Sequence, residues 1–409
     1  MAKKFEEIKE EEYPYELPEG WKWERLGKCV NLSANKTELF LDSTKYVGLE
    51  NIEKDTGIIK YEIGAELKSI KNVFVEGQIL YGKLRPYLNK HGIAKFKGVC
   101  STDILVFSAN NDVSNKWVDY YFNMPSFISY AISNSTGINL PRVNSKSILS
   151  YVIPIPPKET QQKIVDIIES LFAKLDIAQE KVEQVLAESE NRRSAILHNA
   201  FSGKLTEKWR EENNVSFDSW NEYKIKDIAK NIKDKYDPEK DKFLNIPYIG
   251  LEHIEKNNGI VGFSSSEGVK SIKTLFNKND VLYGKLRPYL DKHDIAEYNG
   301  MCSTDIIVYR CKLKETAIIL NYVMSTKQFI EYAVTNSKGI NLPRTSEKII
   351  SEYKLQLPLL TEQKEIARLL DKFLSVEDKV KSTCQSTLEA IAIMRKSILA
   401  KVFRGELVS

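Results

Sequence analysis

The side chains best suited to chemistry lie in a basic, aromatic segment that the chain contains twice. Residues 80–88 have the sequence LYGKLRPYL, and residues 282–290 repeat the same nine letters. Lysine and arginine donate hydrogen bonds to phosphates, arginine can form two parallel bonds with a guanine edge, and tyrosine adds a flat apolar surface. The pattern therefore indicates a contact with nucleic acid. In the alternative interpretation, Leu80, Leu84 and Leu88 belong to a core and the charged side chains are merely solvated.

A second repeated segment, GINLPR at residues 137–142 and 339–344, offers further polar groups. Its asparagine and arginine suit base or phosphate contacts, whereas its glycine and proline equally suit a plain connection between elements. Pro86 favours extended backbone around it, so we expect the basic segment in an exposed loop or at a strand edge. The candidate DNA-binding residues are Lys83, Arg85, Tyr87, Lys90, Asn139 and Arg142, with their copies Lys285, Arg287, Tyr289, Lys292, Asn341 and Arg344.

A third repeated segment, CSTDI, places a hydroxyl group near a carboxylate. Ser101 with Asp103, and Ser303 with Asp305, would be the reacting groups if the chain were an enzyme with twin DNA-acting sites. A hydrogen-bonded turn before a strand explains the same letters more simply. The chain has no G-x-x-x-x-G-K-[ST] phosphate loop and no G-x-G-x-x-G segment, and its four histidines and five cysteines lack metal-ligand spacing. We therefore expect no catalytic residue, no metal site and no cofactor.

Length, charge and cysteine usage set the broad class. The 409 residues exceed what one core usually supports, so two or three domains are expected. No apolar run approaches the ~18–20 residues of a membrane span, and the scattered, odd-numbered cysteines are typical of a reducing compartment, which predicts a cytoplasmic protein without membrane contact. The net charge is +4, and because residues 1–20 are acidic, the positive excess falls on the segments that contain the nonapeptide. Such an excess suits a polyanionic partner.

One constant offset relates all the repeated segments. YVGLENI at 46–52 matches YIGLEHI at 248–254, and FSGKL at 201–205 is followed 202 positions later by FRGEL. A solenoid would repeat every 20–50 residues, so this offset indicates two large sibling units. Within each unit, short β-branched and aromatic runs alternate with turn residues and short amphipathic segments, which predicts a mixed α+β fold.

A long helix is expected after each domain. Residues 159–201 and the matching stretch near the C-terminus carry a heptad seam, and Gly203 and Gly405 suit the left-handed residue that ends a helix. One such rod of roughly 60 Å cannot bury its own apolar stripe, and the order domain, helix, domain, helix predicts an antiparallel pair with an internal pseudo-twofold axis. The predicted seam consists of Ile164, Ile168, Leu171, Leu175, Ala178, Val182, Val185, Ser189, Arg192 and Ile196, and of Ile366, Leu370, Phe373, Glu377, Val380, Cys384, Thr387, Ile391, Met394 and Ile398. Apolar residues off the seam suggest either partner helices or packing on the domains; they are Val165, Phe172, Val376 and Leu388.

These features together resemble the specificity subunit of Type I restriction–modification systems. The resemblance rests on the GLENI-type strand, LYGKLRPYLNK, G-x-N-L-P-R, the I-P-I-P-P-x-x-x-Q-Q-K-I entrance to the long helix and its AFSGKL exit, and it covers Trp21 to Leu407. It implies two similar mixed α/β target-recognition domains separated by two long antiparallel spacer helices. It also implies binding of double-stranded DNA, docking of two methyltransferase subunits and of restriction/translocase subunits, and catalysis by those partners rather than by this chain.

The resulting boundaries are a tail at residues 1–20, target-recognition domains at 21–157 and 220–359, spacer helices at 158–203 and 360–409, and a polar linker at 204–219. Because an antiparallel spacer inverts one domain against the other, like domains should read like half-sites in inverted order. We therefore predict a nearly palindromic target whose half-site centres lie about one helical turn apart.

The two copies differ most at residues 60–66 against 262–268 and at 33–42 against 231–242, where any difference between the half-sites should be read. A coiled-coil adaptor is the remaining alternative, and it would show no salt-dependent affinity for DNA.

Overall fold

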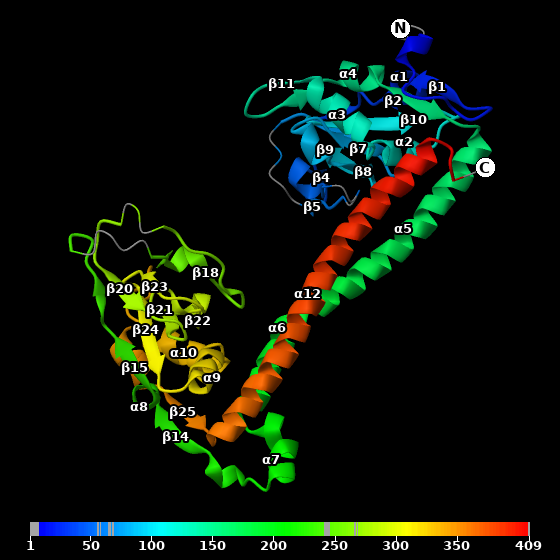
Figure 1. Cartoon of the computed structure of the whole chain (residues 1–409). Coiled ribbons are helices and arrows are strands. Elements are labelled where there is room, and N and C mark those ends of the chain that lie inside the picture. The colour runs from blue at the N-terminus through cyan, green and yellow to red at the C-terminus, as the bar shows by residue number, and fades with distance from the viewer. Residues whose placement is uncertain are drawn as a thin grey trace. The chain divides into compact units, whose positions relative to one another are not determined.

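The chain divides into two compact units, each with its own copy of the repeated segments. The computed structural model describes residues 8–54, 57, 59–63, 67, 69–240, 246–265, 267 and 269–407. Residues 1–182 and 386–409 form the first unit, and residues 183–385 form the second; Figure 1 labels their elements. Among the described residues, no helix is long and apolar enough to cross a membrane.

Two sheets form the framework of the first unit. The strand order is β2-β10-β7-β8 in one sheet and β3-β6-β9-β4-β5 in the other, and β1 pairs separately with β13. The strands are β1 (Lys22–Arg25), β2 (Val30–Leu32), β3 (Lys36–Thr37), β4 (Lys45–Val47), β5 (Glu62–Ile63), β6 (Lys71–Phe74), β7 (Ile79–Gly82), β8 (His91–Ile93), β9 (Gly98–Cys100), β10 (Ile104–Ala109), β11 (Ser135–Thr136), β12 (Arg142–Val143) and β13 (Val152–Ile155). The nonapeptide begins in β7, which lies between β10 and β8 in its sheet. Leu80 and Tyr81 are both buried, and because neighbouring side chains of a strand point to opposite faces, β7 is covered on both sides.

Alternation along β7 and β10 produces two cores in the first unit. Tyr81 and Phe107 face a core with Trp117 and Phe122, whereas Leu80 lies in a second core with residues of the other sheet. The helices are α1 (Leu26–Cys29), α2 (Asn115–Tyr121), α3 (Pro125–Ser133) and α4 (Ser145–Ser150), with the 3₁₀ turns η1 (Glu10–Glu12), η2 (Leu49–Asn51) and η3 (Pro86–Leu88). Helices α2 and α3 are separate because Pro125 begins the second one.

The second unit repeats this framework. Its four-stranded sheets have the orders β15-β24-β21-β22 and β16-β20-β23-β17. The strands are β14 (Asn221–Lys224), β15 (Ala229–Ile232), β16 (Lys235–Tyr236), β17 (Tyr248–Ile249), β18 (Ile254–Glu255), β19 (Gly259–Ile260), β20 (Lys273–Phe276), β21 (Val281–Gly284), β22 (His293–Ile295), β23 (Gly300–Cys302), β24 (Ile306–Cys311) and β25 (Lys354–Leu357). Helices α8 (Ile225–Ile228), α9 (Lys314–Met324), α10 (Lys327–Thr335) and α11 (Glu347–Ser351), with the 3₁₀ turns η6 (Leu251–His253) and η7 (Pro288–Leu290), complete the domain.

Long helices pair in antiparallel fashion within each unit. They are α5 (Lys158–Ala187), α6 (Ser189–Phe201) and α12 (Leu360–Phe403). In the first unit the start of α5 shares a core with the end of α12, and further along α5 Asp176 forms an ion pair with Arg395. In the second unit Arg192 of α6 pairs with Glu377 of α12 at 3.1 Å, and the end of α6 shares a core with the start of α12. Residue numbers thus rise along one helix while they fall along the other, as predicted.

The predicted seam needs two corrections. Val185, Phe373 and Met394 were predicted to lie in the seam but are exposed. In α12 Leu374 is buried and Arg395 makes the ion pair with Asp176, because a straight helix drifts from a strict heptad and shifts the buried position by one. In addition, the first rod is not continuous, since it is interrupted at Glu188 between α5 and α6. Both helix ends are as expected, with Gly203 and Gly405 in the left-handed region.

Of the four off-seam residues, three belong to the first unit, namely Val165, Phe172 and Leu388. Val165 is fully buried, and the Phe172 ring lies 5.9 Å from that of Tyr120. In the second unit Val376 is half-exposed. The alternative of packing on the domain therefore holds for Phe172 and agrees with the burial of Val165, whereas Leu388 is partly buried and Val376 stays exposed.

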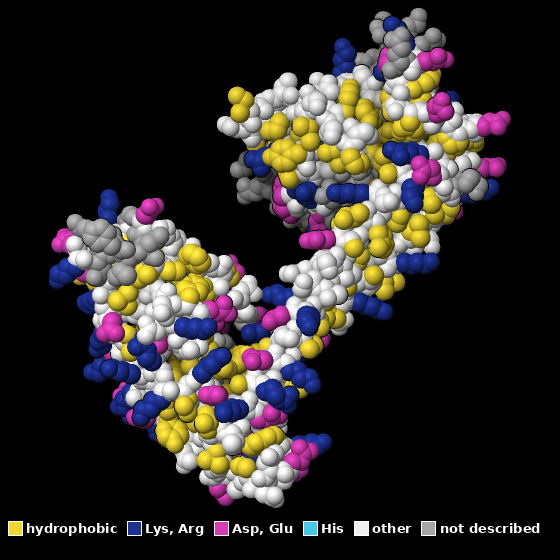
Figure 2. All heavy atoms as spheres, in the orientation of Figure 1, with side chains coloured by type: hydrophobic (Ala, Val, Ile, Leu, Met, Phe, Trp, Pro, Cys, Tyr) yellow, Lys and Arg dark blue, Asp and Glu magenta, His cyan; other side chains and the backbone are white. Residues whose placement is uncertain are grey.

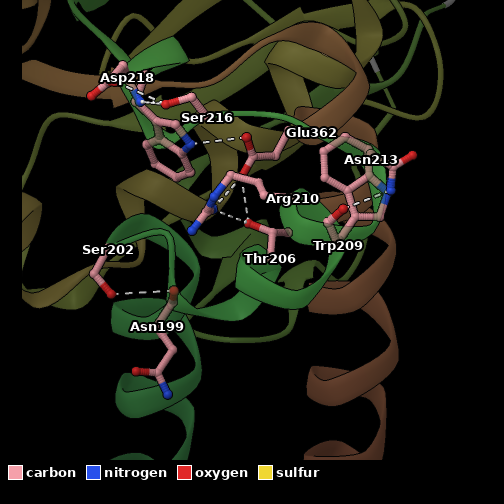
Figure 3. A network of polar contacts seen from close by, with 10 residues as sticks. Asn199, Ser202, Thr206, Trp209, Arg210, Asn213, Ser216, Asp218 and Glu362 are labelled. Atoms are coloured by element: carbon pink, nitrogen blue, oxygen red, sulfur yellow. Dashed lines mark hydrogen bonds and ion pairs between the residues drawn. The ribbon is translucent and has the colours of Figure 1, made fainter.

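The segment expected as a polar linker is folded and anchored. It contains the 3₁₀ turns η4 (Lys204–Thr206) and η5 (Phe217–Ser219) and helix α7 (Glu207–Asn213). The fully buried Glu362 of α12 accepts hydrogen bonds from Arg210 and Thr206, both at 2.7 Å, and from the indole of Trp220 at 3.1 Å. Figure 3 shows Arg210 and Thr206 converging on this carboxylate. Burial of the ion pair explains why a charged, polar sequence is not an extended linker.

The N-terminal tail is docked in its described part. Tyr15 donates a hydrogen bond to the carbonyl oxygen of Phe403, and Glu12 forms an ion pair with Arg25 at 2.8 Å. The segments expected to differ between half-sites lie partly outside the described residues, at 64–66, 241–242, 266 and 268.

Candidate nucleic-acid interface

The LYGKLRPYL and GINLPR segments meet in each unit. In the first unit, Val143 donates its N–H to the carbonyl of Lys83 at 3.1 Å, and Arg85 donates to the carbonyl of Pro141 at 2.7 Å. The second unit repeats both bonds, from Thr345 to Lys285 at 3.0 Å and from Arg287 to Pro343 at 2.7 Å. Two segments about fifty residues apart in sequence thus form one surface, which we call the basic cluster (residues 83–87 with 137–142, and 285–289 with 339–344).

Arginine occupies an unfavourable backbone conformation at the centre of the basic cluster. Arg85 has φ 52° and ψ 64°, and Arg287 has φ 50° and ψ 66°. The expectation that Pro86 keeps its neighbours extended is therefore wrong for Arg85, because the bonds to Pro141 and from Leu88 fix a left-handed turn. A left-handed residue other than glycine costs about 1–2 kcal/mol. Such strain, present in both copies, is typical of functional positions.

Exposed side chains follow this turn. Arg85 is exposed. Tyr87 and Tyr289 are 47% and 50% exposed, although side chains of this size and aromatic character are often buried. The interpretation of this segment as core with a solvated rim therefore does not account for these three residues. Their role in binding stays a prediction.

An acidic residue that the sequence did not single out as a partner holds the second arginine. Arg142 forms an ion pair with Asp103 at 2.8 Å while its side chain stays 53% exposed, and Arg344 pairs with Asp305 in the same way. The N–H of Asp103 donates to the hydroxyl of Ser101 at 3.3 Å. The CSTDI segment is therefore the hydrogen-bonded turn of the simpler interpretation, and its carboxylate orients an arginine.

The candidate lysines differ in their surroundings. Lys90 donates to the carbonyl of Leu49, and Lys292 to that of Leu251, both at 2.6 Å in partly buried positions, so these two lysines hold a neighbouring turn. Burial lowers the pKa of Lys83, and the positive charge of Arg142 lowers it further, although the carboxylate of Asp103 raises it. Lys285 has the same shift from the same kinds of neighbour.

Apolar side chains project from the loop that carries Asn139 and Asn341. Both asparagines are exposed, Ile138 and Ile340 are 100% exposed, and Leu140 and Leu342 are 54% exposed. At Gly137 φ is +103°, and an added Cβ would lie 3.1 Å from the carbonyl oxygen of Leu140, so the tight turn requires glycine. The isoleucines were not among the candidates. The letters GIN indicate this exposure, because an isoleucine between a turn glycine and an asparagine has few neighbours with which to form a core.

A buried histidine cluster lies behind the basic cluster in each unit, and it was also missed. The Nδ1 of His91 lies 2.7 Å from the carboxylate of Asp119, and its Nε2 lies 3.3 Å from the amide nitrogen of Asn89. In the second unit the Nδ1 of His293 lies 2.7 Å from the side-chain oxygen of Asn321, and its Nε2 lies 3.1 Å from the carboxylate of Asp291.

The two histidine clusters thus exchange an amide for a carboxylate at both partner positions. Comparing positions 202 apart would have revealed this exchange. Burial lowers the pKa of His293, but the hydrogen bonds and charge of Asp291 outweigh it, so the pKa is raised above its ordinary value. Because Asn89 and Asp291 directly follow η3 and η7, the clusters fix the turns that carry Arg85 and Arg287. Among the described residues, no group of three or more His, Cys, Asp or Glu is arranged to hold a metal ion.

Comparison with known proteins agrees with this arrangement. A model of the Type I restriction modification DNA specificity domain matches residues 18–187 and again 218–390. The chain is 26% identical to the Type I restriction enzyme EcoDI specificity subunit of Escherichia coli, over 96% of this chain and 89% of that protein. It is 24% identical to the EcoKI specificity subunit of Escherichia coli K12, over 76% of this chain and 68% of that protein.

Solved structures share the fold. The HsdS subunit from Thermoanaerobacter tengcongensis superposes with a TM-score of 0.62 at 19% identity, over 96% of this chain and 99% of that one. A chain from a study of complex assembly and conformational transition of the type I R-M system superposes with a TM-score of 0.77 at 19% identity, over 96% of this chain and all of that one. Since the matched domain model occurs twice and spans most of the sequence, the chain belongs to the family of Type I restriction–modification specificity subunits, which recognise DNA sequence.

Proposed function

We propose that each unit reads one half of a bipartite, nearly palindromic target in double-stranded DNA through its basic cluster. The observation that carries the proposal is the repetition of the same exposed set, Arg85, Tyr87 and Arg142, on the same backbone frame in the second unit. Arg142 uses one nitrogen for Asp103 and retains further N–H donors for a base edge or a phosphate. Like clusters suit like half-sites, and the antiparallel helix pairing in each unit supports half-sites in inverted order.

The same proposal assigns the paired helices to partner subunits. Apolar side chains stay exposed on them, at Ile177, Ile393 and Met394 in the first unit and at Val185, Phe373 and Val376 in the second. Figure 2 shows hydrophobic side chains among the charged ones along these helices. Two such patches support docking of two methyltransferase subunits, with restriction/translocase subunits joining the assembly and the chemistry performed by these partners.

Single-arginine variants test the DNA proposal. We expect Arg142→Ala and Arg344→Ala, each in the full chain assembled with its methyltransferase subunits, to weaken target binding by about 1–3 kcal/mol and to relax specificity in one half-site only. The measurement is a titration of labelled target and of targets mutated in one half, at several salt concentrations. Lys97→Ala, which removes an exposed charge outside the cluster, is the control. Unchanged affinity and salt dependence in both arginine variants would refute the assignment of the cluster.

Substitutions on the helices test the partner proposal separately. We expect Ile393→Glu and Phe373→Glu each to reduce the number of bound methyltransferase subunits from two to one, because a charge in an apolar interface is costly. Mass measurement of the assembled complex gives the stoichiometry. Retention of two subunits by both variants would remove these patches from the interface.

A further inference from the structure

The first unit closes an aromatic groove with its own N-terminal tail. The hydroxyl of Tyr15 donates to the carbonyl of Phe403 at 2.9 Å, and its ring lies 4.9 Å from that of Trp23, whose indole donates to the carbonyl of Tyr15 at 3.2 Å. The guanidinium of Arg404 lies 5.9 Å from the same ring. Burial, together with the nearby Tyr151, raises the pKa of Tyr15 to about 12. Tyr15 is therefore a neutral aromatic plug seated in a formed site.

The second unit contains the corresponding groove, but there it is open. Its cavity volume is about 200 Å³, and a neighbouring hollow of about 280 Å³ shares part of the lining. The lining includes Leu197, His198, Phe201, Val323, Thr326 and Tyr353. Phe201, Tyr353 and Val323 occupy the positions that Phe403, Tyr151 and Tyr121 occupy in the first unit, 202 residues away.

The difference arises because the chain approaches the two domains by different paths. Strand β1 pairs with β13 as β14 pairs with β25, and this register aligns Tyr15 with Asn214. Asn214 ends α7 with φ 53°, and Arg210 of α7 forms an ion pair with the buried Glu362 at 2.7 Å. Among the residues that line the cavity there is none from the segment 204–222. The replacement of Tyr121 by Val323 further enlarges the space.

We propose that this groove is a docking site for a tyrosine side chain presented by an extended, proline-flanked segment of a partner protein. The structure supplies the template, since the tail of this chain places Tyr15, preceded by Pro14, in the equivalent groove of the first unit. An aromatic side chain buries about 150–250 Å² and can hydrogen-bond through its hydroxyl, so one such residue can anchor an interface. Two lysines at the rim of the groove already form ion pairs with exposed carboxylates, Lys327 with Glu331 and Lys354 with Glu222. Exposed ion pairs of this kind contribute little free energy, so we expect little binding energy from these lysines. The aromatic side chain therefore carries the recognition.

A peptide titration tests this site without DNA, so that its outcome is independent of the proposal for the basic cluster. The probe is the chain's own segment 9–18, KEEEYPYELP, added to the full-length chain in a calorimetric titration, with KEEEYPAELP as the control peptide. We expect one bound peptide per chain and at least tenfold weaker binding of the control peptide. The variant Tyr15→Ala, which vacates the groove of the first unit, should raise the stoichiometry to two.

A plugging substitution locates the binding. Gln328 lines both hollows and is exposed, so we expect Gln328→Trp to abolish binding to otherwise unaltered chain. Ser126→Trp, at the matching position of the first unit, is the control and should leave one bound peptide. The proposal is overturned if the unaltered chain binds no peptide up to about 1 mM, whether or not Tyr15→Ala binds one, or if Gln328→Trp leaves binding unchanged.

Discussion

The two units begin their long helices with one shared contact and one that differs. Gln161 of α5 and Gln363 of α12 both donate to the carbonyl of a proline five residues earlier, at 2.9 Å. The residue before each glutamine is Thr160 in the first unit but the buried Glu362, bonded to Arg210, in the second. The repeated glutamine maintains the helix entrance, whereas the neighbouring position determines how the adjoining segment is anchored.

The histidine clusters give the same comparison inside the domains. His91 and His293 sit in the same frame, yet the carboxylate belongs to α2 in the first unit (Asp119) and to the residue that ends η7 in the second (Asp291). One carboxylate per histidine is kept while its position changes. What the two copies share is therefore a contact between a buried histidine and one carboxylate rather than a fixed set of residues.

The largest expected effect comes from breaking the anchor that only the second unit has. Arg210→Ala leaves Glu362 buried without its cation, and we expect a loss of about 3–5 kcal/mol in the unfolding free energy of the second unit. Thr160→Ala in the first unit is the matched control and should cost less than about 1 kcal/mol. Denaturant unfolding followed by hydrogen exchange assigns each loss to its unit. Similar losses for both variants would contradict an anchor specific to the second unit.

An exchange of residues sharpens the comparison of the histidine clusters. Asp119→Asn should cost about 1.5–3 kcal/mol, because a hydrogen bond to a charged group is lost in a buried site. Adding Asn89→Asp, which gives the first unit the arrangement of the second, should recover most of that loss. The recovery should extend to DNA affinity, since the cluster fixes the turn of Arg85. A double variant no better than Asp119→Asn would show that the two arrangements are not equivalent.

The pH dependence follows from the raised pKa of His293. Because the folded pKa lies above the unfolded value of about 6.5, the stabilisation is fully present below about pH 6.5 and is lost as pH rises through the folded pKa. We expect the difference in unfolding free energy between the unaltered chain and Asp291→Asn to be largest below about pH 6.5 and to decrease as the pH rises above it. A difference that grows with pH would reverse the assignment of a charged pair.

The smallest expected effect concerns the left-handed arginines. Arg85→Gly removes the unfavourable backbone conformation, and we expect stability to rise by about 1 kcal/mol or less. The same change should weaken binding of one half-site, which separates a functional arginine from a structural one. The paired measurement is thermal unfolding with DNA titration, and Arg287→Gly should affect the other half-site. Gain of stability without loss of affinity would place Arg85 outside the interface.

Sequence reasoning recovered the architecture because it depends on periodic and repeated signals. The constant offset predicted two sibling domains, and the heptads predicted antiparallel helices, although helical drift misplaced Phe373 and Met394. The anchoring of residues 204–219 was not predicted, because the sequence does not distinguish a buried, ion-paired Arg210 from a solvated arginine. The sequence also did not predict the roles of Asp103, Ile138 and the histidine clusters. These roles depend on contacts that join segments far apart in sequence.

Selection of the bound target from random DNA, by the full chain assembled with its methyltransferase subunits, tests the central claim most directly. Sibling basic clusters, in two units whose long helices pair in antiparallel fashion, predict two short half-sites related by inversion, identical or nearly so, with several unspecified base pairs between them. Recovery of two unrelated half-sites, or of a direct repeat, would contradict the account.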